Sequence, residues 1–305
     1  MRPSYFGDLE GFEEFEYFEP KTVKEVCSLL SQYKEKAKVI AGGTQLFEAM
    51  KRKEISPQYL INLKSVPSLE HITYDDEEGL KLGALTTLFE IGRSPLVNDK
   101  AKILAEAIQE REIETNKTRW AYYMATLGGC LSHADASADI LPPLLLLGAK
   151  AVIEGPKGWK TTTLEDLFVR SGEPVLQMDE VLIEIRIPSQ PAEIGHIYIK
   201  GQGTTSAPLL RVATLVKLDA KHVDIEEFKI VVGGITPNPL EARGAEGIMK
   251  GKAIDNDLIE ETAQAAAEEV SEGADTETTE RVKDLIEEAI RQAVDLAIGD
   301  FALGY

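Results

Sequence analysis

The chain has 305 residues, of which 43% are hydrophobic and 28% charged, and its formal net charge at pH 7 is −19. This length and composition predict about two globular domains with a sizeable apolar core. The acidic balance argues against a nucleic-acid-binding protein, because a polyphosphate normally needs a basic face, and equally against attachment to an anionic membrane surface.

The sequence shows neither a targeting segment nor a cysteine motif. The N-terminal segment has no basic stretch followed by an apolar one, so no signal peptide is predicted. The most apolar run, residues 140–149, is too short to span a bilayer, and we expect a cytoplasmic protein. Two cysteines, Cys27 and Cys130, are too few for a four-thiolate cluster and have no zinc spacing. We expect both to be free thiols.

The first half of the chain predicts mixed helices and strands. Apolar positions on one face predict a helix at 22–33, capped by Thr22. A strand at 38–41 runs into Gly42-Gly43, followed by a helical turn at 46–51. The remaining expected elements are strands at 59–63, 69–73 and 79–85, helices at 87–91 and 100–111, a second Gly-rich loop at 126–130, and a buried helix at 140–147.

The second half predicts strands and then long helices. Strands are expected at 150–153, 160–163, 181–187, 196–200, 213–218 and 227–232, and amphipathic helices at 258–270 and 278–298. This order gives an α+β fold with helices segregated around largely antiparallel sheets. A Pro-containing break at 188–191 places the domain boundary between residues 1–190 and 191–305.

The first glycine motif, Ala41-Gly42-Gly43-Thr44-Gln45-Leu46, lies between a strand and a helical turn. Glycines let a backbone approach an anion, and exposed N–H groups at such a turn hold phosphate oxygens. Taken alone, a Gly-Gly turn between a strand and a helix is more often plain turn geometry. Neither the G-x-G-x-x-G fingerprint nor a P-loop is present, so nucleotide binding by those two folds is excluded.

The second motif, Thr126-Leu127-Gly128-Gly129-Cys130, leads through His133 and Asp139 into an apolar helix. Its glycines, hydroxyls and carboxylates suit a pyrophosphate, a ribose and a ring edge together. Asp139 either accepts from ribose hydroxyls or caps the helix that begins at Ile140. His133 is either a cofactor contact or a hydrogen-bonded loop histidine.

The two motifs together resemble those of the flavoprotein subunits of the xanthine dehydrogenase and carbon monoxide dehydrogenase family. The first is continued by Met50-Lys51, Pro57 and Leu60–Leu63; the second by Ala138-Asp139 and Pro142–Leu144. Further matches are Asp179–Ile183, Tyr198-Ile199-Lys200 and Gly233–Pro237 with Ala242-Arg243. The resemblance extends from about Phe15 to Ala297.

The resemblance implies a fold and an activity. Residues 1–190 would form a vanillyl-alcohol-oxidase-like (PCMH-type) FAD-binding domain of two α/β subdomains. Residues 191–305 would form a smaller C-terminal α+β domain of the CO dehydrogenase flavoprotein type, with an antiparallel sheet plus helices. The chain would be an oxidoreductase subunit whose FAD passes electrons from a small [2Fe–2S] subunit to NAD, a quinone or another external acceptor. A large subunit would hold the molybdenum cofactor.

Carried over residue by residue, the resemblance predicts contacts with FAD. The first loop would wrap the pyrophosphate, Asp139 would bind ribose, and Leu182 and Lys200 would lie near the adenine and isoalloxazine parts. The expected set is Val39, Ile40, Ala41, Gly42, Gly43, Thr44, Gln45, Leu46, Thr126, Gly128, Gly129, Cys130, His133, Asp139, Leu182 and Lys200. No catalytic acid–base pair, nucleophile or metal ligand is expected.

Some positions depart from the family pattern. Tyr122-Tyr123 stand where the family usually has Arg-Asn, Cys130 replaces Asn, and Gln45 replaces Asp. These changes bear on flavin affinity and redox tuning. Two alternatives stay open: a standalone flavin oxidoreductase of related fold, and a scaffold subunit that has lost FAD, which the departures at Tyr122-Tyr123 and Cys130 motivate. The first is disfavoured because neither a separate substrate domain nor a flavin-attachment motif is visible.

Overall fold

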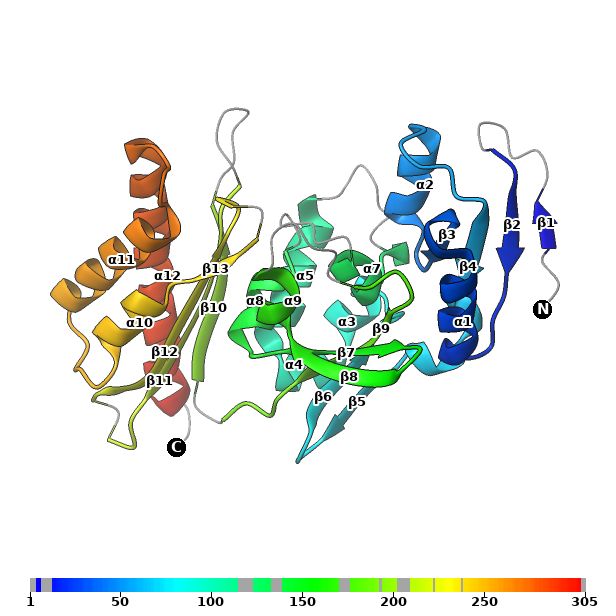
Figure 1. The fold of residues 1–305 in the computed structure, drawn as a ribbon. Coiled ribbons are helices and arrows are strands. Elements are labelled where there is room, and N and C mark those ends of the chain that lie inside the picture. The colour runs from blue at the N-terminus through cyan, green and yellow to red at the C-terminus, as the bar shows by residue number, and fades with distance from the viewer. Residues whose placement is uncertain are drawn as a thin grey trace. The chain divides into compact units, whose positions relative to one another are not determined.

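The computed structural model describes residues 4–6, 13–114, 123–132, 139–169, 176–191, 194–201, 209–221, 223–236 and 238–302. The chain divides into two compact units (Figure 1). The first unit is Met1–Ala134 with Gly148–Ser189, and the second is Asp135–Leu147 with Gln190–Tyr305. The main division falls in the Pro-containing break, and the segment 135–147 belongs to the second unit, which the sequence did not indicate.

The N-terminal part of the first unit is a four-stranded sheet with helices α1 (Val23–Tyr33) and α2 (Thr44–Lys51). Its strands are β1 (Ser4–Phe6), β2 (Phe15–Phe18), β3 (Ala37–Ile40) and β4 (Tyr59–Asn62), in the order β1-β2-β4-β3. Strand β4 runs parallel to both of its neighbours. Thr22 caps α1 by accepting from the Glu25 N–H at 3.2 Å, as predicted.

The rest of the first unit is a five-stranded antiparallel sheet with short helices. The strand order is β5-β6-β9-β7-β8. The strands are β5 (Ile72–Asp75), β6 (Gly79–Gly83), β7 (Lys150–Gly155), β8 (Gly158–Thr163) and β9 (Val181–Ile187). The helices are α3 (Leu88–Arg93), α4 (Pro95–Lys100), α5 (Lys102–Glu114), α7 (Leu127–Ser132) and α9 (Leu164–Val169).

The second unit is an antiparallel sheet covered by helices. The sheet order is β10 (Ile194–Lys200), β11 (Arg211–Leu218), β12 (Ile225–Gly233) and β13 (Leu240–Glu241). Helices α10 (Arg243–Met249), α11 (Asn256–Val270) and α12 (Thr276–Ala302) cover one face, and α8 (Leu141–Leu146) packs against β11 and β12 from the other (Figure 1). Strand β11 is consequently buried over nearly its whole length.

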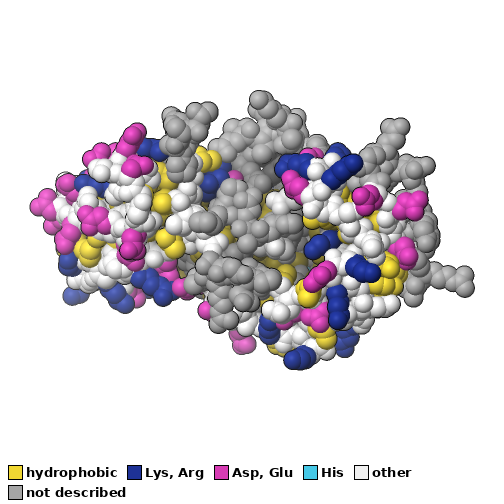
Figure 2. Space-filling model, turned by 45° about the horizontal axis from the view of Figure 1, so that its top comes forward, with side chains coloured by type: hydrophobic (Ala, Val, Ile, Leu, Met, Phe, Trp, Pro, Cys, Tyr) yellow, Lys and Arg dark blue, Asp and Glu magenta, His cyan; other side chains and the backbone are white. Residues whose placement is uncertain are grey.

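The structure confirms the α+β class and most of the predicted elements. One prediction was wrong: Gly128 and Gly129 lie in helix α7, not in a loop. Among the described residues, no helix combines the length and apolar character needed to cross a bilayer. On the face seen in Figure 2, the described Lys and Arg side chains stand among Asp and Glu side chains instead of forming a continuous basic surface.

Candidate functional site

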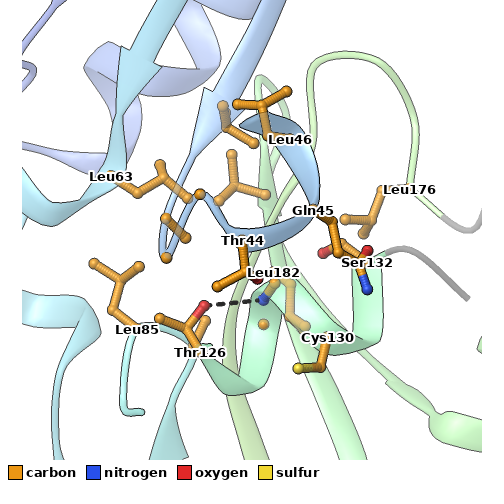
Figure 3. Close-up of a pocket in the computed structure, with 18 of the residues that line it drawn as sticks. Thr44, Gln45, Leu46, Leu63, Leu85, Thr126, Cys130, Ser132, Leu176 and Leu182 are labelled. Carbon is orange, nitrogen blue, oxygen red and sulfur yellow. Dashed lines mark hydrogen bonds between the residues drawn. The ribbon is translucent and has the colours of Figure 1, made fainter. Parts of the chain in front are cut away.

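A cavity in the first unit collects both glycine motifs (Figure 3). It encloses about 810 Å³ of empty space, part of it open to solvent. Its wall is formed by the end of β3, the start of α2, the residues after β6, helix α7 and the start of β9. Segments more than 80 residues apart in the sequence therefore meet around one space.

The first glycine pair is required by the backbone. Gly43 has a φ of 73°, in the left-handed region, and is the N-cap of α2. Gly42 has no room for a side chain, because a Cβ there would overlap the carbonyl oxygen of Met124 and lie 2.8 Å from its carbon. Met124, two residues before the second motif, is thus in direct backbone contact with the first motif.

The second glycine pair opens helix α7. The Gly128 N–H donates to the Ala84 carbonyl at 2.8 Å, and a Cβ on Gly128 would lie 2.8 Å from the Ala84 Cβ. The Thr126 hydroxyl oxygen accepts from the Gly129 N–H at 3.2 Å, the bond drawn in Figure 3. Thr126 thus takes the part of an N-cap, and the glycines allow the helix to start against Ala84.

The electrostatic character of the cavity comes mainly from the backbone. Among the lining residues that the structure describes, Glu180 is the one carboxylate and no Lys or Arg is present. Glu180 pairs with Lys160 at 2.5 Å and accepts from the Gln177 N–H at 3.1 Å. Favourable potential for an anion is therefore supplied by the N-terminal N–H groups of α2, with the Thr44 hydroxyl beside them.

Apolar walls complete the cavity. Leu63, Leu85 and Leu182 point into it from different elements (Figure 3). The cavity thus has backbone N–H groups at the start of α2 and leucine side chains on its other walls. This combination suits a ligand in which a diphosphate is joined to flat aromatic rings. The residues present therefore fit a flavin dinucleotide.

Most of the predicted contact residues of the first unit meet at this cavity. Those that line it are Val39, Ala41, Gly42, Gly43, Thr44, Gln45, Leu46, Thr126, Gly128, Gly129, Cys130 and Leu182. Ile40 is not among them; its side chain is buried in a core cluster with Phe15 and Leu60. His133 lies outside the described residues.

Asp139 and Lys200 belong to the second unit and contact each other. Asp139 is buried, and Lys200 Nζ lies 3.3 Å from its Oδ1. Arg211 Nε and the Tyr198 hydroxyl, at 3.4 Å, donate to the same oxygen. The alternative that Asp139 caps the following helix was wrong, because Ile140 is the N-cap of α8 and no side chain caps it.

Sequence reasoning missed several residues of these sites. Glu180, Ser132, Leu63 and Leu85 line the cavity, and Arg211 binds Asp139. A signal existed only for Arg211, which is the first residue of a mostly apolar, buried strand, where an unpaired charge is costly.

Comparison with known proteins gives two family matches. Residues 13–190 match the model described as "FAD binding domain in molybdopterin dehydrogenase". Residues 205–294 match "CO dehydrogenase flavoprotein C-terminal domain".

Individual relatives agree with these matches. The carbon monoxide dehydrogenase medium chain of Hydrogenophaga pseudoflava is 29% identical over 83% of this chain and 85% of its own length. The nicotine 6-hydroxylase medium subunit of Paenarthrobacter nicotinovorans is 29% identical over 91% of this chain and 95% of its own length. A solved structure of carbon monoxide dehydrogenase from H. pseudoflava superposes with a TM-score of 0.81 at 27% identity, covering 92% of this chain and 98% of that chain.

Proposed function

The chain belongs to the family that carries the FAD binding domain in molybdopterin dehydrogenase, and on that premise we propose that it is the FAD-binding electron-transfer subunit of a heteromeric molybdenum hydroxylase. Electrons would arrive from [2Fe–2S] clusters of a small partner subunit and leave to an external acceptor. A large partner subunit would hold the molybdenum cofactor and oxidise the substrate. The relatives named medium chain or medium subunit support an assembly of this kind.

The observation that carries the proposal is the convergence of both glycine pairs on one cavity. The N–H groups at the start of α2 would hold the diphosphate, and the Thr44 hydroxyl would donate a further hydrogen bond. Leu85 and Leu182 would exclude water from the rings. FAD itself supplies the redox chemistry when bound, whereas the protein binds and orients it.

The described residues that line the cavity offer one titratable carboxylate. Glu180, its one carboxylate, is engaged by Lys160 and by the Gln177 N–H. Among the described residues there is no group of three His, Cys, Asp or Glu side chains that could hold a metal.

The test is to add FAD to the purified chain and measure bound flavin by absorption and by equilibrium titration. Gly43→Val is expected to abolish retention, because it combines strain at a φ of 73° with a Cβ 2.8 Å from the Phe47 ring. Gly251→Val is the matched control: its φ is 76°, nothing described lies within 4 Å of the added Cβ, and it should keep FAD.

The outcomes separate the alternatives. A colourless wild-type protein after addition of FAD would support the scaffold alternative and refute the proposal. Equal flavin content in the Gly43 and Gly251 variants would refute the cavity as the site. Purification of the native complex with molybdenum and iron would support the heteromeric assembly, and a flavoprotein that purifies alone would support the standalone oxidoreductase.

A further inference from the structure

The one carboxylate among the described residues that line the cavity belongs to Glu180. Glu180 directly precedes strand β9, and its side chain is only 14% exposed. The N–H groups at the start of α2 suit a diphosphate, whereas a carboxylate repels one. With a dinucleotide in the cavity, Glu180 must therefore face a part of the ligand that carries no negative charge and donates hydrogen bonds.

The position of the Glu180 carboxylate is fixed by the protein itself. Its Oε1 accepts from Lys160 Nζ at 2.5 Å, and its Oε2 accepts from the Gln177 N–H at 3.1 Å. The Glu180 N–H in turn donates to the Gln177 carbonyl at 3.0 Å. Gly155 leaves space for the Glu180 side chain, because a Cβ at Gly155 would lie 3.1 Å from Glu180 Cγ. The carboxylate is thus held at the cavity wall by protein contacts alone.

The carboxylate keeps acceptor capacity for a ligand. Its two oxygens together accept about four hydrogen bonds, and the contacts with Lys160 and Gln177 use one on each oxygen. Lys160 is 55% exposed and is not among the described residues that line the cavity. The cation that balances Glu180 therefore stands outside the lining, and what the cavity receives from this pair is an acceptor.

The neighbouring lining favours a flat ring as the part of the ligand that donates. Leu182, two positions after Glu180, points into the same cavity (Figure 3), and an apolar side chain suits the face of a ring. FAD contains two ring systems. The N–H on the edge of the flavin lies between two carbonyl oxygens, which a carboxylate would repel, whereas adenine offers an exocyclic amino group. The amino group of adenine is therefore the better match for Glu180.

We propose that Glu180 is a specificity-determining residue of the cavity, whose carboxylate accepts a hydrogen bond from the exocyclic amino group of the adenine of FAD, with the ring against Leu182. This inference rests on the proposed function, because it concerns how the cavity recognises FAD. It assigns the ring that carries an amino group to the Glu180 side of the cavity and the diphosphate to the start of α2.

The test compares FAD with its hypoxanthine analogue, in which a carbonyl oxygen replaces the amino group of adenine. Dissociation constants are measured by equilibrium titration of the whole chain. The wild-type protein should prefer FAD by roughly tenfold or more, as expected for loss of a hydrogen bond to a charged group. In Glu180→Gln the preference should fall to about one, because an amide accepts from an amino group and donates to a carbonyl oxygen equally well.

Two further variants complete the design. Glu226→Gln is the matched control: Glu226 pairs with Lys217 at 2.8 Å, lies outside the described cavity lining, and should keep the wild-type preference. Glu180→Asp covers the case in which Glu180→Gln does not fold. It keeps the charge but draws the carboxylate back by one CH₂ group, and the preference should fall severalfold.

The outcomes distinguish this inference from the proposed function. Equal affinity of the wild-type protein for FAD and the analogue would overturn the role of Glu180 and leave FAD binding intact. An unchanged preference in the Glu180 variants would likewise overturn it, because another group would then recognise the amino group. Failure of the wild-type protein to bind either dinucleotide would instead overturn the proposed function, and this inference with it.

Discussion

The substitution Gly42→Ala tests whether the two glycine motifs form one structure. Its added Cβ would overlap the carbonyl oxygen of Met124 and lie 2.8 Å from the carbonyl carbon and 3.4 Å from the Ala125 Cα. Ordinary van der Waals contact begins at 3.4 Å, so the carbon alone must move by about 0.6 Å and the oxygen further. Both partners are backbone atoms, and no change of rotamer relieves the overlap.

The magnitude follows from this overlap. Forcing an extra carbon into a packed site costs about 1–3 kcal/mol, and here the strain falls between the two segments that line the cavity. We expect the free energy of unfolding to fall by about that amount, measured by urea denaturation. Displacement of either segment also moves the N–H groups that would hold a diphosphate, so FAD affinity should fall by at least about tenfold.

Gly247→Ala is the control for a glycine changed to alanine. Gly247 lies in α10, where nothing described lies within 4 Å of an added Cβ. That variant should be neutral or gain up to about 1 kcal/mol from helix propensity, with unchanged FAD binding. If Gly42→Ala matched this control in both stability and FAD affinity, the contact between the two motifs would have no role in the site.

Two further predictions concern titratable groups. Burial, and next to it the charge of Glu241, raise the pKa of Glu246 from 4.5 to about 7. The folded state therefore binds this proton more tightly than the unfolded state, and the free energy of unfolding falls as the pH rises from about 4.5 through 7. Glu246→Gln should remove this pH-dependent fall in the free energy of unfolding. It should stabilise the protein at pH 8 by about 1–3 kcal/mol, with the lower value expected because solvent partly screens the charge. If urea denaturation gave the variant the same pH dependence of unfolding free energy as the wild type, the prediction would be contradicted. Burial raises the pKa of the Cys27 thiol to about 11, so Cys27 should react slowly with a thiol reagent at pH 8. The reagent should label the cavity-lining Cys130 first, and bound FAD should slow that labelling. Fast labelling that persists in the Cys130→Ser variant would contradict this prediction.

The elements that sequence predicted best are those whose signal is local. Helix α1 has its apolar stripe and its Thr22 cap within 12 residues, and both are present as expected. Strand β4 is a short apolar run. The elements that were missed depend on distant partners: α10 contains Gly244 and Gly247, which lower helix propensity, and is stabilised by packing of Ala245 and Met249 in the core.

Helix α7, at the cavity, is another element that the sequence pattern did not predict because it depends on a distant segment. A Gly-Gly pair predicts a loop, because glycine disfavours helix by about 1 kcal/mol per residue. The helix nevertheless begins there, since the Leu127 and Gly128 N–H groups donate to carbonyls of Thr86 and Ala84 at 3.0 and 2.8 Å. Only the absence of a Cβ on Gly128 permits that approach. The motif was therefore recognised from the right residues, while its conformation was set by a segment some 40 positions away.

The charged cluster of the second unit was missed for a different reason. Asp139 was predicted as either a ligand contact or a helix cap, because sequence shows a carboxylate before an apolar helix and no more. Its partner Arg211 is 72 positions away and opens a strand of mostly apolar, buried residues. A charge at a buried position of such a strand implies a buried partner, but which carboxylate provides it depends on how α8 packs against β11 and β12. The sequence pattern therefore identifies which residues need a buried partner, whereas tertiary packing decides which residue that partner is.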